Sequence, residues 1–287
     1  MTDGTAGSSP SSGSPWTDLD RPPLREAELR HALVGAGGLW REVRVVAETG
    51  SSNADLAERA GEDEGLVLVA EYQNAGRGRL DRTWTAPPRS GLFLSVLLRP
   101  AEVPVARWGW LPLLAGVAAA EATSRVAGLD VRLKWPNDLL VGDRKLAGIL
   151  AERAGDGVVL GIGLNVSLRE HELPVPGATS LALADSITTD RDPLLRALLR
   201  GLESWYERWR TAAGDPHASG LHAAYTAACA TLGRTVRVEL PAARVLTGTA
   251  TGIDDDGRII VDTPEGHEAV GAGDVVHVRP AGEAPHT

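Results

Sequence analysis

The amino-acid sequence predicts an α+β fold, in which a mixed or mainly antiparallel sheet with flanking helices is followed by a small β-barrel. The predicted helices and strands do not follow the regular β–α–β alternation of a doubly wound fold. Residues 131–166 have the pattern of three successive strands joined by short turns. From residue 233 onward, short β-rich runs alternate with Gly, Pro and Asp, which is typical of a small barrel.

We expect four parts in the chain of 287 residues: a tail (1–20), a main domain (21–232), a barrel (233–280) and a second tail (281–287). Residues 1–18 are mostly Ser, Gly, Thr, Pro and Asp. Such a segment buries too little apolar surface to offset the entropy lost on ordering, so we expect it to be disordered.

Composition excludes several classes of protein. The net charge of −9 argues against non-specific binding of nucleic acid. The single cysteine, Cys229, rules out an intrachain disulfide and any site built from several cysteines, and it fits a reducing cytoplasm. The first residues lack the basic-then-apolar pattern of a secretory signal. The most apolar helical candidate, residues 111–122, is too short to span a bilayer, so we expect no membrane partner.

The main domain begins with alternating helical and extended patterns. Ser51-Ser52-Asn53 can cap the helix that follows, because each side chain accepts hydrogen bonds from backbone amides. Pro100 closes one strand. The predicted elements are a helix (24–34), a strand (43–47), a helix (54–60), strands (66–72 and 91–99) and a long Ala-rich helix (105–127).

The three-strand segment has turns at residues 142–143 and 155–157. Two helices, 194–210 and 221–232, complete the main domain. The barrel is expected to contain strands at 235–240, 245–253, 257–261 and 275–278.

The register of the first turn places polar side chains on the sheet. If Val141 pairs with Arg144, then Asp138 lies opposite Ala147. A three-residue second turn at 155–157 then places Ala147 opposite Asn165.

Asp138 and Asn165 would therefore share one face, separated by two strand spacings, roughly 10 Å. Lys145 would lie near one end of the same hairpin. A carboxylate, a carboxamide and an ammonium thus converge over the small Ala147, which leaves room for a ligand. The alternative is that Asn137 and Asp138 are only turn and cap residues.

Lysine usage points to the same segment. The chain contains two lysines, Lys134 and Lys145, and otherwise uses arginine for positive charge. Lysine offers a compact, mobile ammonium that arginine does not reproduce. We therefore expect a specific role for this segment, with chance clustering as the alternative.

A second cationic feature is the loop Gly76-Arg77-Gly78-Arg79, with Arg82 three residues later. Glycine permits close backbone approach, and guanidinium groups bind phosphate or carboxylate through paired hydrogen bonds. The loop lacks the Gly-Lys-Ser/Thr of a Walker A sequence. A flexible basic surface loop is the alternative.

Other residues indicate polar recognition without a covalent enzyme nucleophile. Ser51-Ser52-Asn53 offer hydroxyl and amide groups to a polar head group, and residues 161–165 form a Gly-spaced strand over which a flat ligand can lie. None of the seven histidines lies beside these motifs, so a Ser-His-Asp triad has little support. Cys229 lies in a predicted helix, where a buried structural thiol is expected.

Together these motifs resemble the biotin protein ligases. The resemblance spans about residues 43–280 and is carried by four segments in order: Gly76–Arg79 after Glu71-Tyr72-Gln73, Lys134–Asp138, Arg144–Leu150 and Gly161–Val166. It implies a catalytic biotin- and ATP-binding domain (21–232) like those of class II aminoacyl-tRNA synthetases, and an SH3-like barrel. It also implies ATP-dependent formation of biotinyl-5′-adenylate, then transfer of biotin to a lysine of a biotin carboxyl carrier protein.

The resemblance further implies roles for individual residues. The catalytic residues would be Lys145, Arg77 and Asp138, with Asp138 orienting Mg²⁺ or accepting a proton from the incoming lysine. Biotin and ATP would be the substrates. Biotin would contact Ser51, Ser52, Asn53, Gln73, Arg77, Gly78, Arg79, Lys145 and Gly148. ATP and the adenylate would contact Arg77, Arg79, Arg82, Trp84, Lys145 and Asn165.

The sequence departs from the family pattern in two places. Asp81 stands where a small or basic residue is usual, and its carboxylate could pair with Arg79 or Arg82. Residues 1–40 are too short and too rich in Ser, Gly and Pro at the start for a helix-turn-helix domain, so we expect a short form without regulatory DNA binding. The alternatives are a ligase of the lipoate type and a biotin-responsive regulator without turnover.

Overall fold

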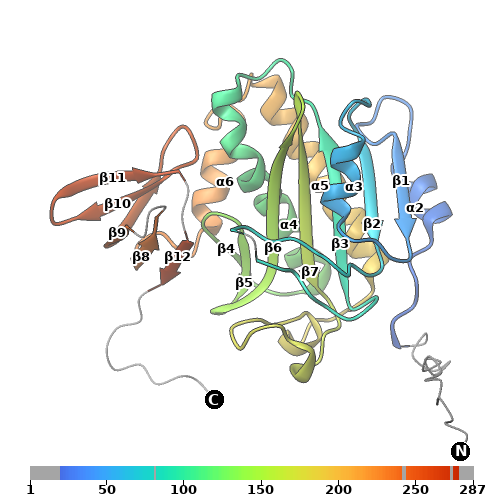
Figure 1. The fold of residues 1–287 in the computed structure, drawn as a ribbon. Coiled ribbons are helices and arrows are strands. Elements are labelled where there is room, and N and C mark those ends of the chain that lie inside the picture. Colours follow the sequence, from blue (N-terminus) through green and yellow to red (C-terminus); the bar gives the residue numbers. More distant parts are fainter. Residues whose placement is uncertain (1–19, 81, 241–243, 272–273, 278–287) are drawn as a thin grey trace, which may run out of the picture.

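The computed structural model describes residues 20–80, 82–240, 244–271 and 274–277. The two predicted tails lie outside the described residues, except for residue 20. Asp81 and the last residue of the predicted strand 275–278 also lie outside them. The described chain forms two sheets, a large one packed among helices and a smaller one beside it (Figure 1). The proposed boundary at 232/233 falls between the last helix and the first strand of the smaller sheet.

The large sheet has seven strands in the order β1-β2-β3-β7-β6-β5-β4. Strands β1 and β2 are parallel, and every other neighbouring pair is antiparallel. The predicted mixed, mainly antiparallel sheet is therefore confirmed. The strands are β1 (Glu42–Val46), β2 (Leu66–Ala70), β3 (Gly91–Leu98), β4 (Val131–Lys134), β5 (Asp138–Val141), β6 (Arg144–Ala154) and β7 (Gly157–Asn165).

Helices cover both faces of this sheet. In Figure 1, α4 (Leu111–Ala127) and α5 (Arg191–Thr211) lie behind it, and the short α3 (Ser52–Glu58) lies in front of β2, β3 and β7. The remaining helices are α2 (Glu26–Leu33) and α6 (Leu221–Ala228). The predicted helix 105–127 is divided, because a 3₁₀ segment, Val105–Trp110, precedes α4, whose first turn holds Pro112.

The predicted β5–β6 register is correct at the turn and wrong beyond it. Val141 pairs with Arg144 as expected, but a β-bulge between Leu139 and Leu140 makes Asp138 pair with Gly148 instead of Ala147. The backbone amide of Lys145 donates to Gly177 O (2.7 Å), so a segment outside the hairpin also holds the bulged part of β6.

The second turn is also one residue tighter than predicted. Ala154 pairs with Gly157, and Gly148 therefore lies opposite Gly163. The two register errors compensate: Asp138 and Asn165 remain on one face, because Asn165 lies two residues from Gly163 along β7. The floor between them is made of glycines, whereas the predicted floor residue, Ala147, is fully buried in the core.

Helix α6 ends earlier than predicted. Residues 229–231 leave the helix and pair with β4, where Ala230 N donates to Leu133 O (2.7 Å) and Trp135 N donates to Thr231 Oγ1 (3.0 Å). Cys229 therefore follows the helix as its cap instead of lying within it. Its thiol is buried, as expected.

The smaller sheet has five antiparallel strands in the order β11-β10-β9-β8-β12. Strand β11 was not predicted, because its exposed Gly266, His267 and Ala269 lack an alternating apolar pattern. The strands are β8 (Thr235–Glu239), β9 (Val245–Ile253), β10 (Ile259–Thr263), β11 (Gly266–Val270) and β12 (Asp274–His277).

The β9–β10 turn docks against the main domain through two buried tryptophans. Trp110 Nε1 donates to Asp255 O (2.8 Å) and Trp135 Nε1 donates to Gly257 O (3.0 Å). In the described part of the chain, no helix is both long enough and apolar enough to cross a bilayer.

Candidate active site

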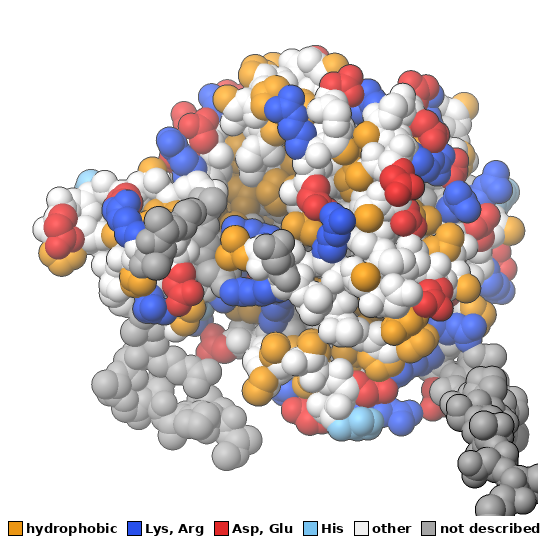
Figure 2. Space-filling model, viewed as in Figure 1, with side chains coloured by type: hydrophobic (Ala, Val, Ile, Leu, Met, Phe, Trp, Pro, Cys, Tyr) orange, Lys and Arg blue, Asp and Glu red, His pale blue; other side chains and the backbone are white. Residues whose placement is uncertain are grey.

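A cavity of about 370 Å³ lies over β6 and β7, which is within the usual size range for small-molecule sites. The described residues of the loop, 73–80 and 82–90, cross in front of these strands (Figure 1), and Figure 2 shows Lys and Arg side chains gathered with apolar ones on that face. Every site residue predicted from the sequence lines the cavity: Ser51, Ser52, Asn53, Gln73, Arg77, Gly78, Arg79, Arg82, Trp84, Asp138, Lys145, Gly148 and Asn165.

One end of the cavity is polar and closed by the start of α3. Ser51 caps this helix by accepting a hydrogen bond from Ala54 N, so the cap prediction holds for Ser51. Gln73 Oε1 accepts from both the backbone amide (2.8 Å) and the hydroxyl (3.0 Å) of Ser52. The helix start thereby presents Ser51, Ser52 and Gln73 together.

Asn53 is buried against β7, where Gly161 makes room for it. A Cβ built on Gly161 would lie 2.1 Å from Asn53 Oδ1. The Asn53 amide also accepts from Ser95 Oγ (2.6 Å) and donates to Glu152 Oε2 (2.7 Å). Gly161 is therefore required at this position for the packing of Asn53, which gives a specific reason for the Gly-spaced strand.

The other end of the cavity holds the lysine. Lys145 Nζ lies 2.6 Å from Asp138 Oδ1, and both side chains are largely shielded from solvent. Thr179 N donates to Lys145 O (2.8 Å), so residues 177–179 fix the backbone on both sides of this lysine. Asn165 donates through Nδ2 to Thr179 O (2.9 Å), which ties the predicted carboxamide to the same segment.

The loop covers the glycine floor with an indole ring. Cβ atoms on Gly148 and Gly163 would lie 2.9 and 2.7 Å from the Trp84 ring. Lys145 Nζ lies 5.6 Å from the centre of that ring, a cation–π distance. Trp84 Nε1 is buried with no hydrogen-bond partner among the described residues, so it is a donor available to a ligand.

The loop cations are anchored to the sheet. Arg77 donates to Glu152 Oε1 (3.2 Å), and Arg79 donates to Asn137 Oδ1 (3.0 Å). Sequence reasoning missed Glu152 and Ser95 as parts of the site. Ser95 carried a signal, since it is the one polar residue in the otherwise apolar β3, whereas Glu152 had none beyond its place on β6.

The arrangement combines cations, a carboxylate and neutral hydrogen-bonding groups around a cavity with apolar floor and walls. It suits a ligand with a neutral polar head group and an anionic end. No cluster of three His, Cys, Asp or Glu side chains suited to a metal occurs among the described residues. A metal here would need ligands from substrate phosphates in addition to Asp138, a common arrangement for Mg²⁺.

Comparisons with known proteins agree with this chemistry. The sequence profile of the biotin/lipoate A/B protein ligase family matches residues 45–168. The profile of the biotin protein ligase C-terminal domain matches residues 231–278. The first match covers β2 to β7 of the large sheet and the end of β1, and the second covers all five strands of the smaller sheet.

Individual relatives are similar over most of the chain. A Mycobacterium tuberculosis biotin–[acetyl-CoA-carboxylase] ligase is 48% identical over 92% of this chain and 100% of its own length. A Bacillus subtilis bifunctional ligase/repressor is 31% identical over 88% of this chain and 78% of its own. The Aquifex aeolicus biotin protein ligase solved with biotin and ATP is 27% identical, with a TM-score of 0.70 over 84% of this chain and 100% of its own.

Proposed function

Since the chain belongs to the biotin protein ligase family, we propose that it is a biotin–[biotin carboxyl-carrier protein] ligase. In the first step, the biotin carboxylate oxygen attacks the α-phosphorus of ATP, giving biotinyl-5′-adenylate and releasing pyrophosphate. In the second, a lysine amine of the carrier attacks the acyl carbon and loses a proton, giving an amide and AMP. The single observation that carries the proposal is the gathering of all four sequence motifs around one cavity.

The first step brings two anions together, so cations must offset their repulsion and the developing negative charge. Lys145 is the proposed contact for the carboxylate and the α-phosphate, held at a fixed position by Asp138. Arg77, Arg79 and Arg82 belong to the loop above, and closing that loop would exclude water from the anhydride. Trp84 is a proposed wall for the adenylate, with Asn165 at its other side.

The second step needs a group that accepts the proton of the carrier's lysine. Asp138 is the proposed acceptor, and its ion pair with Lys145 fixes where the carboxylate lies. Mg²⁺ is a proposed second partner of Asp138, where it would neutralise phosphate charge when bound with ATP.

The neutral head group of biotin is assigned to the polar end of the cavity. Ser51, Ser52, Asn53 and Gln73 provide hydroxyl and amide groups there, and Ser51, Ser52 and Asn53 are buried. Hydrogen-bonding sites of this kind discriminate strongly, because a wrong ligand leaves their buried groups unpaired. Gly78 and Gly148 allow the ligand to lie close to the backbone. The carrier is proposed to be the biotin-accepting domain of a carboxylase, and the reaction to be cytoplasmic.

The proposal is tested by incubating the purified chain with labelled biotin, ATP, Mg²⁺ and a carrier domain. We expect amide-linked label on the carrier and release of AMP and pyrophosphate. A parallel reaction with lipoate distinguishes biotin from the second acyl group named in the wider biotin/lipoate ligase family. Label from lipoate but not from biotin would overturn the proposal, and biotin binding without any transfer would favour a regulator.

A further inference from the structure

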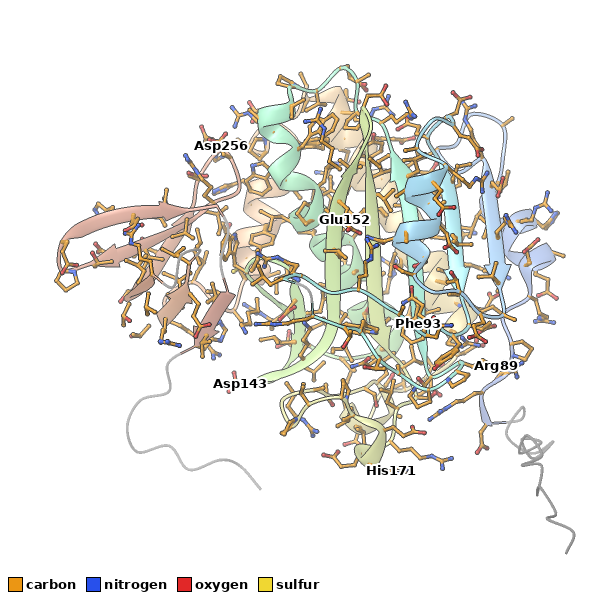
Figure 3. All side chains as sticks on the ribbon, viewed as in Figure 1. Arg89, Phe93, Asp143, Glu152, His171 and Asp256 are labelled. Carbon is orange, nitrogen blue, oxygen red and sulfur yellow. The ribbon has the colours of Figure 1, made fainter. Side chains whose placement is uncertain are left out.

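Glu152 lies on β6 beside α3 (Figure 3) and bridges two groups of the cavity. Its Oε2 accepts from Asn53 Nδ2 and its Oε1 accepts from Arg77. Among the described residues, Glu152 lies just outside the cavity lining, which includes Asn53 and Arg77. It is therefore placed to act on the ligand through its neighbours.

The contacts continue from Glu152 as one chain of hydrogen bonds. Asn53 Oδ1 accepts from Ser95 Oγ (2.6 Å), and Ser95 Oγ lies 2.7 Å from Ser52 Oγ. Ser52 in turn contacts Gln73 Oε1. Ser52, Asn53 and Ser95 are all buried, so each donor and acceptor in the chain needs a partner.

An ionised carboxylate fixes the direction of donation along this chain, because it only accepts hydrogen bonds. Facing Glu152 at 2.7 Å, with Leu150 O as a longer second acceptor at 3.4 Å, Asn53 presents its NH₂ group, which turns its oxygen toward Ser95. The Ser95 hydroxyl has one proton and donates it to Asn53 Oδ1. In its contact with the Ser52 hydroxyl, Ser95 can therefore only act as the acceptor. The proton of Ser52 is directed to Ser95 or Gln73, and its lone pairs remain for the cavity.

We propose that Glu152 is a positioning residue that sets this direction and thereby selects a ligand head group with an N–H donor at Ser52. The inference rests on the proposed function, since the ureido ring of biotin provides such donors. The ion pair with Arg77 does not by itself explain Glu152, because the two side chains are 34% and 54% exposed and exposed pairs contribute little to stability.

The test uses the isosteric variant Glu152→Gln. A glutamine both donates and accepts, so Asn53 can turn over and the chain can reverse. We expect the dissociation constant for biotin, measured by calorimetry, to rise about tenfold, with the urea midpoint unchanged. Biotin methylated at the ureido nitrogen should bind wild type more weakly than biotin does. Glu152→Gln should reduce this difference in affinity between the two ligands.

A double-mutant cycle tests whether Glu152 acts along the chain. Ser95→Ala removes the link between Asn53 and Ser52, so adding Glu152→Gln should weaken biotin binding no further. Ser95→Cys is the second variant if Ser95→Ala does not fold. The matched control is Glu268→Gln on β11, whose 33% exposed carboxylate pairs with Arg244 away from the cavity. This control should bind biotin like wild type.

Two results would overturn the inference. One is wild-type biotin affinity in Glu152→Gln, and the other is a loss that adds in full to that of Ser95→Ala. Failure of wild type to bind biotin at all would instead contradict the proposed function, so the two failures are distinguishable.

Discussion

Position 161 must be glycine because the Asn53 side chain packs directly on it. Asn53 occupies the volume that a β-carbon on Gly161 would need, and it is held there by Ser95 and Glu152. From the sequence, the glycines of this strand were expected to leave space for a flat ligand. The structure gives a second reason, because the space at Gly161 is filled by a recognition residue of the chain itself.

Gly161→Ala should therefore impair binding more than folding. Asn53 must move, and we expect biotin affinity to fall at least about tenfold, with a stability loss of about 1–3 kcal/mol for an overpacked site. Calorimetry and urea unfolding measure the two effects. The control is Gly252→Ala on β9, where a β-carbon would lie 3.6 Å from the Ile260 side chain and should be tolerated. Unchanged biotin affinity in Gly161→Ala would contradict the packing argument.

Lys145→Arg tests the placement of a charge. The variant keeps the positive charge but spreads it over a larger planar group, and it cannot reproduce the 2.6 Å contact with Asp138 in the same space. We expect adenylate formation, followed by single-turnover kinetics, to slow by at least about tenfold, with a smaller effect on biotin affinity. Wild-type adenylation rates would refute the role of Lys145.

At the level of elements, the turn between β5 and β6 was predictable and the bulge beside it was not. Gly142-Asp143 carries a local turn signal, and Val141 pairs with Arg144 as that signal predicts. The bulge depends on residues 177–179, which pair with Lys145 from far along the chain. Sequence patterns within a hairpin contain no information about such a partner, so the register of the site could not be obtained from them.

The contact between β12 and β8 predicts a pH effect on stability. Burial, assisted by the charges of Lys134 and Arg234, lowers the pKa of His277 from 6.5 to about 4. Asp143, which pairs with Arg234, opposes this effect. Between these pH values the unfolded chain binds a proton at this site and the folded chain does not. The contribution of neutral His277 to the free energy of unfolding is therefore fully present above about pH 6.5, and it is lost as the pH is lowered toward 4.

His277→Asn should remove this component. The loss of stability between pH 7 and pH 5, measured as the shift in urea midpoint, should be smaller in the variant than in wild type. His31→Asn, on the exposed side of α2, is the control for replacing a histidine. Equal pH sensitivity of His277→Asn and wild type would show that the ring does not titrate as its surroundings predict.

For the molecule as a whole, the fold class and the position of the site could be predicted from the sequence. The contact of the β9–β10 turn with Trp110 and Trp135 could not. Three of the four motif segments converge because strands β5, β6 and β7 are consecutive neighbours, and the loop with Gly76–Arg79 lies over them. No role of this kind was predicted for Trp110 and Trp135, yet their indole groups bind the β9–β10 turn. Nothing in their local sequence distinguishes a tryptophan that packs only against the large sheet from one that also contacts the smaller sheet.

Trp110→Phe should weaken this contact with the β9–β10 turn. The variant keeps an aromatic ring but removes the donor to Asp255 O, and we expect a loss of about 1–3 kcal/mol and earlier unfolding of the smaller sheet. Urea unfolding followed by circular dichroism and hydrogen exchange measures both effects. Trp108→Phe is the control, because its indole donates to the nearby Val103 O (3.1 Å). An unchanged midpoint in Trp110→Phe would contradict the docking role.

The scarcity of lysine has a consequence for an enzyme that makes a reactive acyl donor. An acyl-adenylate modifies free amines, and the protein surrounding it is the first target. This chain has two lysine side chains, and the one nearest the proposed reaction is an ammonium paired with Asp138. A protonated amine has no lone pair to attack the acyl carbon. The protein therefore offers its own product few nucleophiles, which leaves the carrier's lysine as the favoured acceptor.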